Sequence, residues 1–229
     1  MTEFTGDAES IRARYAEVCR RVAAAAEAGG RDGEPVEILV ATKYVPAEHM
    51  QVLVEAGIPL VGENRAQALV VKHKLYGDAF VWDFIGHLQS RKTKLVLPIV
   101  RLIHSVWTMS VVQEIQARAQ RPVRVLLELN LSEEETKSGL KPSEVAAFLD
   151  EASACDKVNF AGLMCMPPLS DDPEQARPLF ADVREHARRL SEQWRGRYTF
   201  AELSMGTSSD YEVAVQEGAT IVRVGSVLF

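Results

Sequence analysis

Short apolar runs alternate along the chain with amphipathic stretches, and this alternation predicts a β/α protein. Eight runs are rich in Val, Ile and Leu, with little polar alternation inside them, which is typical of parallel strands covered on both faces. The intervening stretches carry apolar residues at helical spacing. The predicted strands are 36–42, 58–62, 80–85, 101–106, 123–129, 158–164, 199–203 and 220–224.

A further helix is predicted ahead of the first strand, from apolar residues at helical spacing: Ile11, Tyr15, Val18 and Val22. Eight strands with intervening helices in 229 residues predict a (β/α)₈ TIM barrel that this helix precedes. We therefore expect a single domain over residues 1–229, with the helix in 1–30 and the barrel in 36–229. A doubly wound open sheet is the alternative, because sequence constrains strand order poorly.

Composition narrows the class of protein. The chain is 47% hydrophobic and 25% charged, as in ordinary globular proteins, and its formal net charge of −6 argues against a nucleic-acid partner. Three cysteines without a short-spaced pair predict free thiols in a reducing compartment. We see neither a signal peptide at the start nor an apolar run long enough to span a bilayer, so we expect a cytoplasmic protein without a membrane partner. The five histidines show no metal-ligand spacing, and no metal is expected.

Lys43 is the most informative single residue. It ends the first apolar run, where a buried strand meets its loop. Partly apolar surroundings disfavour the charged ammonium, so we expect the pKa of Lys43 to fall. The neutral amine is the form that attacks an aldehyde to make a Schiff base. The alternative is a lysine that merely caps the strand and reaches into solvent.

The ends of the last two predicted strands offer a phosphate site. The seventh strand runs into Ser-Met-Gly-Thr-Ser-Ser-Asp at 204–210, and the eighth runs into Gly225-Ser226. Glycines let the backbone approach a ligand, while hydroxyls and helix-start amides donate to phosphate oxygens. Ser209 with Glu212 also predicts a capping box there. A lysine that forms imines, together with a phosphate cradle, indicates pyridoxal 5′-phosphate (PLP).

Arg223 lies near the end of the last strand and could face the pyridine nitrogen of that cofactor. An arginine there would keep the nitrogen unprotonated, because two adjacent positive charges repel each other. A structural ion pair with a nearby carboxylate is the alternative.

The chain resembles the pyridoxal phosphate homeostasis proteins, a single-domain family related to the N-terminal barrel of alanine racemase. The resemblance covers almost the whole chain and rests on many short motifs in one order. These motifs are Ala41-Thr42-Lys43, Gly62-Glu63-Asn64-Arg65, Phe84-Ile85-Gly86-His87-Leu88-Gln89, Lys137-Ser138-Gly139, Gly162-Leu163-Met164, Ser204-Met205-Gly206 with Ser208 and Asp210, and Arg223-Val224-Gly225.

The resemblance implies roles for individual residues. Lys43 would carry the internal aldimine, and Arg223 would lie against the pyridine nitrogen. The phosphate would be held by Ser204, Gly206, Thr207, Ser208, Gly225 and Ser226. The rim of the pocket would include Asn64, Met164 and His87. Thr207 stands where the family usually has methionine, but it still offers a hydroxyl and an amide.

The resemblance also implies a function. We expect a regulatory or carrier protein that binds PLP and takes part in intracellular PLP homeostasis, rather than an enzyme with an established turnover. Its partners would be PLP and the PLP-dependent apo-enzymes that receive it. A monomer is expected, since the chain lacks the second domain through which racemases dimerise. One alternative is a weak PLP-dependent amino-acid racemase that acts through Lys43. Another is a class I aldolase-like barrel that uses no cofactor.

Overall fold

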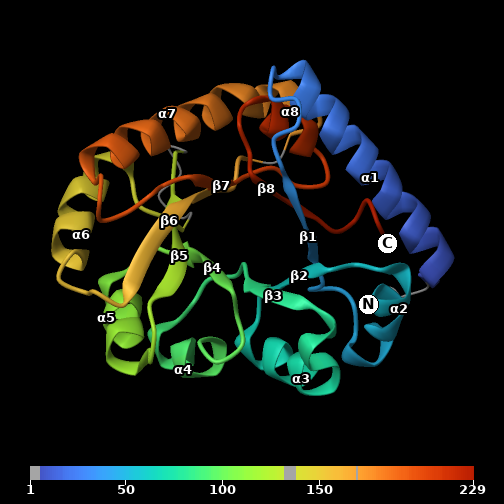
Figure 1. Cartoon of the computed structure of the whole chain (residues 1–229), viewed down its shortest axis with the longest axis horizontal. Helices are drawn as coiled ribbons and strands as arrows, with labels where there is room; N and C mark the ends of the chain where they lie inside the picture. The colour runs from blue at the N-terminus through green and yellow to red at the C-terminus, as the bar shows by residue number, and fades with distance from the viewer. Residues whose placement is uncertain (1–5, 132–137, 169) are drawn as a thin grey trace.

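A computed structural model of the chain describes residues 6–131, 138–168 and 170–229. Eight parallel strands close into a barrel in the order β1 to β8, each beside the next in the chain (Figure 1). The barrel closes where β1 pairs with β8, from Glu37 opposite Ile221 to Val40 opposite Val224. This closure confirms the predicted barrel and excludes the open doubly wound sheet.

The observed strands overlap all eight predicted ranges. They are β1 (Glu37–Ala41), β2 (Leu60–Glu63), β3 (Val81–Phe84), β4 (Leu102–Val106), β5 (Val123–Leu129), β6 (Val158–Cys165), β7 (Glu202–Ser204) and β8 (Ile221–Val224). β7 differs most from the prediction, because the segment 199–201 is not part of the strand. Phe200 there has a φ of 46°, and this left-handed conformation interrupts extended backbone.

Helices cover the outside of the barrel. They are α1 (Ala8–Ala28), α2 (Gln51–Ala56), α3 (Ala66–Tyr76), α4 (Thr93–Val96), α5 (Met109–Arg118), α6 (Val145–Ala152), α7 (Arg177–Gln193) and α8 (Tyr211–Gln216). The predicted first helix is α1, which Asp7 caps by accepting a hydrogen bond from the Ser10 amide at 2.9 Å. α1 packs beside α2 and α8, as Figure 1 shows.

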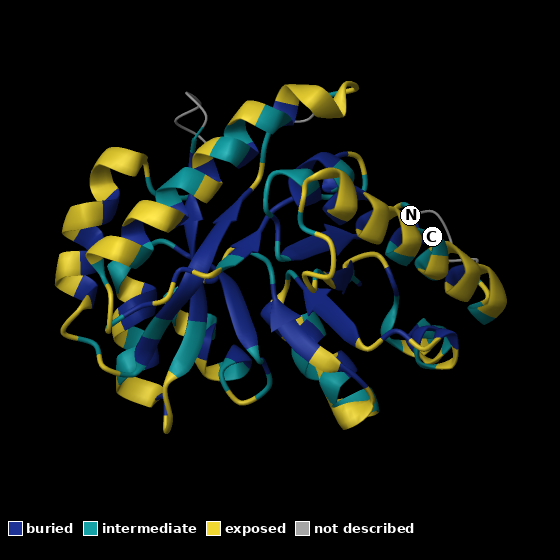
Figure 2. Ribbon diagram, turned by 45° about the horizontal axis from the view of Figure 1, so that its top comes forward, coloured by how far each residue is buried: buried dark blue, intermediate teal, exposed yellow. Residues whose placement is uncertain are grey.

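The apolar core has two parts. The larger part lies between strands and helices, so the strands are buried while the helices expose their outer faces (Figure 2). A smaller apolar cluster fills the inside of the barrel and consists of Leu39, Leu60, Leu102, Leu126, Ala161, Met164 and Ile221, with Ile85 packed against it. Because side chains alternate along a strand, the residue two positions after a cluster member faces the same interior.

Candidate functional site

A polar layer follows the inner apolar cluster toward the carboxyl ends of the strands. His104, Glu128 and Arg223 each come two residues after a leucine or isoleucine of that cluster, and all three are buried. In (β/α)₈ barrels the functional groups gather at this end. The barrel mouth is therefore the candidate functional site of this chain.

Arg223 is held by four contacts inside the mouth. Its Nη1 donates to the carbonyl of Ser204 at 2.6 Å and to the Ser204 hydroxyl, while its Nη2 donates to the carbonyl of Cys165 at 2.9 Å and to Met166 Sδ at 2.9 Å. These partners are carbonyls, a hydroxyl and a thioether, and among the described residues no carboxylate forms the ion pair that was the alternative. Burial lowers the pKa of the guanidinium.

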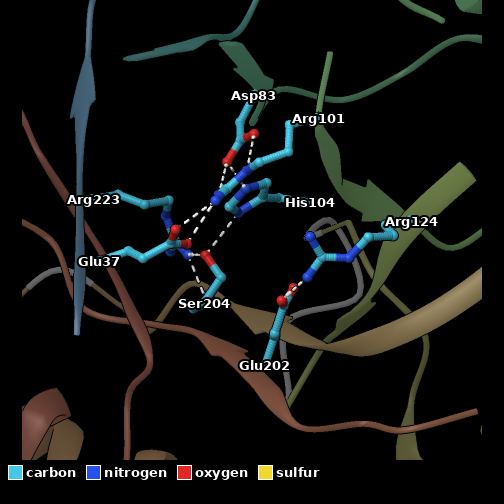
Figure 3. Close-up of polar contacts among 8 residues, drawn as sticks. All are labelled: Glu37, Asp83, Arg101, His104, Arg124, Glu202, Ser204 and Arg223. Atoms are coloured by element: carbon cyan, nitrogen blue, oxygen red, sulfur yellow. Dashed lines mark hydrogen bonds and ion pairs between the residues drawn. The ribbon is translucent and has the colours of Figure 1, made fainter. Parts of the chain in front are cut away.

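A line of hydrogen bonds leads from Arg223 into the barrel (Figure 3). The Ser204 hydroxyl lies 2.8 Å from His104 Nδ1, and His104 Nε2 lies 3.1 Å from Asp83 Oδ2. Burial lowers the pKa of His104 although the neighbouring carboxylate of Asp83 opposes this effect. The buried ring is therefore neutral. A neutral ring satisfies the line in one sense: Arg223 donates to Ser204, Ser204 donates to Nδ1, and Nε2–H donates to Asp83.

Asp83 connects this line to the opposite end of the barrel. Burial raises its pKa, but hydrogen bonds from His104 and Arg101 outweigh that effect, and the net pKa is lowered. Arg101 binds both oxygens of Asp83, at 3.1 and 2.7 Å, and also pairs with Glu37 at the start of β1. The sequence analysis missed His104 and Asp83, whose only signal is an ionisable side chain inside a mostly apolar strand.

The loop between β7 and α8 contains the predicted phosphate residues. Gly206 has a φ of 88°, and a Cβ there would lie 2.6 Å from the Ala214 Cβ and 2.9 Å from the Tyr211 Cα, so only glycine fits. The Ser208 hydroxyl accepts hydrogen bonds from the amides of Gly225 and Val227, at 3.0 and 3.4 Å. Two amides from the end of β8 thus converge on one oxygen atom, which is the arrangement that an anion needs.

Two predicted residues of this loop have other partners. Thr207 directs both its amide and its hydroxyl to Asp210 Oδ1, at 2.6 and 3.0 Å. Ser204 turns its hydroxyl to His104 and Arg223 instead of the loop. The expected capping box is wrong as well, because α8 begins after Asp210 without a side-chain cap, and the Glu212 carboxylate pairs with Arg21 of α1.

Lys43 follows β1, the strand that pairs with β8. Ala41, two residues before it, is in close contact with the position of Gly225, where a Cβ would lie 3.7 Å from the Ala41 Cβ. The Lys43 side chain is exposed, and its Nζ lies 4.8 Å from the ring centroid of Tyr44. The apolar surroundings that we expected for its amine are therefore absent among the described residues. The amine lies instead over the ring of Tyr44, which is itself exposed.

Two buried side chains hold the backbone and side chain of Thr42, the residue before Lys43. Lys72 of α3 donates from Nζ to the Thr42 carbonyl at 2.8 Å and forms an ion pair with Glu63 at the end of β2. The Thr42 hydroxyl donates to Glu63 Oε1 at 2.8 Å. Lys72 and Glu63 are almost completely buried, at 5% and 1% side-chain exposure. The sequence analysis missed this pair, although a lysine on the inner face of a helix is a signal for it.

The remaining predicted residues that the structure describes lie at or just after the carboxyl ends of strands. Asn64 follows β2 and is half-buried, and the backbone of Gly86 packs directly against it. Met164 belongs to the inner apolar cluster. His87 is exposed, with its ring 5.5 Å from that of Trp107. Ser226 is exposed at the end of β8, and Lys137 lies outside the described residues.

The described residues contain neither a metal-binding cluster nor a membrane-spanning helix. In that part of the chain no group of three or more His, Cys, Asp and Glu side chains could hold a metal ion. None of the helices described is both long enough and apolar enough to cross a membrane.

Comparisons with known proteins agree on one family. The model of the alanine racemase N-terminal domain matches residues 46–229. The pyridoxal phosphate homeostasis protein of Aquifex aeolicus is 38% identical over 222 residues, which cover 94% of this chain and 96% of that protein. The protein of the same name from Escherichia coli K12 is 30% identical and covers 96% of this chain and 95% of its own length.

Solved structures give the same result. An unknown protein from Bifidobacterium adolescentis superposes with a TM-score of 0.87 at 32% identity, covering 100% of this chain and 98% of that chain. PipY of Synechococcus elongatus, solved with PLP bound, superposes with a TM-score of 0.81 at 29% identity, covering 96% of this chain and 99% of that one. The chain therefore belongs to the pyridoxal phosphate homeostasis protein family, which has the barrel of the alanine racemase N-terminal domain.

Proposed function

We propose that this protein holds PLP in the barrel mouth through a covalent imine bond to Lys43 and takes part in intracellular PLP homeostasis as a carrier or regulator. When bound, PLP supplies an aldehyde carbon that reacts with amines. Family membership and the PLP-bound relative support the cofactor. The aldolase-like alternative, which needs no cofactor, thereby loses its support.

One observation carries the assignment of the site. The end of β1, which bears Lys43, adjoins the end of β8, where two amides converge on the Ser208 oxygen. A primary amine and a set of candidate phosphate donors therefore follow the ends of neighbouring strands. This donor set fits a molecule that carries both an aldehyde and a phosphate, since the amine bonds to one and the amides bind the other.

The other residues divide the remaining tasks. Gly206, Ser208, Gly225 and Ser226 bind phosphate, and Thr207 joins them by releasing Asp210. Arg223 stays fixed by Ser204 and the Cys165 carbonyl and presents a cation to the pyridine nitrogen. Asn64 and Met164 line the mouth. A positive partner at that nitrogen makes the ring a weak electron sink, and this favours holding the cofactor over turning substrates over.

The test is covalent trapping. Purified protein is incubated with PLP, reduced with borohydride, digested, and analysed by mass spectrometry for a modified lysine. We expect modification at Lys43 and a visible absorption band near roughly 420 nm, the usual band of a protonated imine of this cofactor. Lys43→Ala should lose both. Lys94→Ala, at an exposed lysine of α4, is the matched control and should keep them.

The outcomes separate the hypotheses. Labelling at another lysine, or none, would reject the covalent role of Lys43. A chiral assay of single L-amino acids with the loaded protein then tests the racemase alternative. Racemisation that disappears in Lys43→Ala would replace the carrier proposal by an enzyme.

A further inference from the structure

Glu128 is a buried carboxyl group that the assignments above leave unused. It is the sixth residue of β5 and is only 5% exposed. Leu126, two residues earlier, belongs to the inner apolar cluster. Met164, which is opposite Glu128 in the β5–β6 register, belongs to that cluster too. Because side chains alternate along a strand, Glu128 faces the barrel interior at the level of the mouth.

The position of β5 makes this carboxyl a partner for whatever binds at Lys43. Three strands lie between β5 and β1 in either direction around the closed barrel, so the two strands are opposite each other. Arg223, and His87 from the loop after β3, both lie near enough to Glu128 to lower its pKa through their charge. A molecule held between Lys43 and Arg223 therefore has Glu128 on its far side.

The two oxygens of Glu128 differ in their surroundings. The Ser138 hydroxyl donates to Oε1. Oε2 is buried and has no hydrogen-bond partner among the described residues. An unpaired buried oxygen is unfavourable in a folded protein, and its presence in a site indicates a partner that binds there.

The contact with Ser138 is built into the backbone. Leu140 donates to the Glu128 carbonyl at 2.9 Å, and Asn130 donates to the Leu140 carbonyl at 2.9 Å. Gly139 lies so close that a Cβ would be 2.8 Å from the Asn130 nitrogen. This pairing fixes Ser138 over Oε1, so the carboxyl is oriented before any ligand arrives.

The protonation of Glu128 follows from these surroundings. Burial raises its pKa, and the opposing effects of Ser138, His87 and Arg223 do not cancel that rise. The strands on either side of Glu128 place no charge next to it. Met164 of β6 is opposite Glu128 in register, and toward β4 the adjacent pair is Leu127 with Val106. Since Ser138 already donates to Oε1, a proton on the carboxyl belongs on Oε2, which is then a donor.

We propose that Glu128 is a ligand-binding residue of the mouth, and that its protonated Oε2 donates a hydrogen bond to an acceptor atom on the heterocycle bound between Lys43 and Arg223. This inference rests on the proposed function, because it takes PLP and its analogues as the ligands. It adds a residue on the strand opposite Lys43. It also makes affinity depend on pH, since the ionised carboxylate cannot donate.

The experiment measures dissociation constants between pH 6 and 9 for wild type, Glu128→Gln and Glu128→Leu. The probes are PLP and pyridoxine 5′-phosphate, the alcohol analogue that cannot bond to a lysine. Glutamine keeps the shape and a donor without titrating, whereas leucine keeps the volume without a donor. Comparing the proteins at each pH cancels the titration of the probe itself.

For both probes we expect the ratio of the wild-type to the Glu128→Gln dissociation constant to rise with pH, as the wild-type carboxyl ionises. Glu128→Leu should bind about tenfold more weakly than wild type at pH 6, the usual effect of losing one hydrogen bond in a site. A ratio that is constant with pH, together with leucine binding within about twofold of wild type, would overturn the inference. If Glu128→Leu fails to fold, the glutamine ratio decides alone.

Failure of the proposed function would look different. Wild type that binds neither probe would reject both the PLP site and the role of Glu128. Wild type that binds both probes but is not trapped at Lys43 would reject only the covalent role, and the pH-dependent ratio would still test Glu128.

Discussion

Lys72 and Glu63 form a buried ion pair directly beneath the strand end that bears Lys43. Besides the pair itself, Lys72 donates to the Thr42 carbonyl, and the Thr42 hydroxyl donates to Glu63. Every one of these contacts ends on the residue before Lys43 or on the strand beside it. The pair therefore positions the proposed reactive lysine without touching its side chain.

Breaking this pair should destabilise the fold strongly. Lys72→Met leaves the Glu63 carboxylate buried without its partner, and we expect a loss of about 3–5 kcal/mol in the free energy of unfolding. Urea denaturation measures it. Arg188→Met, in an exposed pair with Glu185, is the control and should barely move the midpoint. Equal effects of the two substitutions would contradict the role of the buried pair. Lys72→Met with Glu63→Leu should recover much of the loss, because no isolated charge remains buried.

Stability should fall on mild acidification because of His104. Its folded pKa is lowered, so below the ordinary histidine value of about 6.5 the unfolded chain binds a proton that the folded protein does not. Stability thus falls as pH drops through 6.5 toward the folded pKa. Urea midpoints from pH 7.5 to 5 should decline less steeply in His104→Gln than in wild type. His186→Gln, on the outer helix α7, should keep the wild-type slope, and a wild-type slope in His104→Gln would count against this account.

Gly206→Ala should weaken both the fold and phosphate binding. Gly30 has a similar left-handed φ, 72° against 88°, but nothing lies within 4 Å of a Cβ there. Gly30→Ala therefore measures the conformational effect alone, about 1–2 kcal/mol. Gly206→Ala adds the clash with Ala214 and Tyr211, for which we expect at least about 1 kcal/mol more. Denaturation and inorganic phosphate binding test this; equal losses in the two variants would show that the loop relaxes.

Arg223→Lys should bind PLP more weakly although charge is kept. The guanidinium bonds to the Ser204 and Cys165 carbonyls through different nitrogens, and a single ammonium cannot span both in the same plane. We expect about a tenfold loss of affinity, the usual size of one charged hydrogen bond. Titration with PLP, followed by absorbance, measures it. Arg195→Lys, at an exposed position after α7, is the control. Unchanged affinity in Arg223→Lys would mean that the planar fork is unimportant.

Much of this architecture could be predicted from the sequence, because strands buried on both faces are continuous apolar runs. The β5 prediction, 123–129, matches its observed bounds. The start of β7 could not be predicted, since the left-handed backbone of Phe200 leaves no mark in an apolar pattern. Side-chain partners were also beyond the pattern. His104 and Ser204 are 100 residues apart, and only the barrel brings their side chains together.

The candidate site could be predicted by position but not by contact. Gly206 and Arg223 were recognisable from motif and strand register. The competition of Asp210 for the donors of Thr207 was not, because a short loop offers several partners of equal reach. The exposure of Lys43 could not be predicted either. The predicted strand ends at residue 42, so its alternation does not give the direction of the Lys43 side chain.

The end of the barrel opposite the mouth is tied across its strands. Arg101 joins Glu37 of β1 to Asp83 of β3, and Arg124 of β5 pairs with Glu202 of β7 (Figure 3). Neither pair of strands is adjacent, so these side chains act as struts across the opening of the cylinder. At the mouth, the loop after β7 is joined to the residues after β8 through the neutral Ser208 hydroxyl. Ion pairs thus set the spacing of non-adjacent strands at the end of the barrel that lies away from the proposed cofactor site.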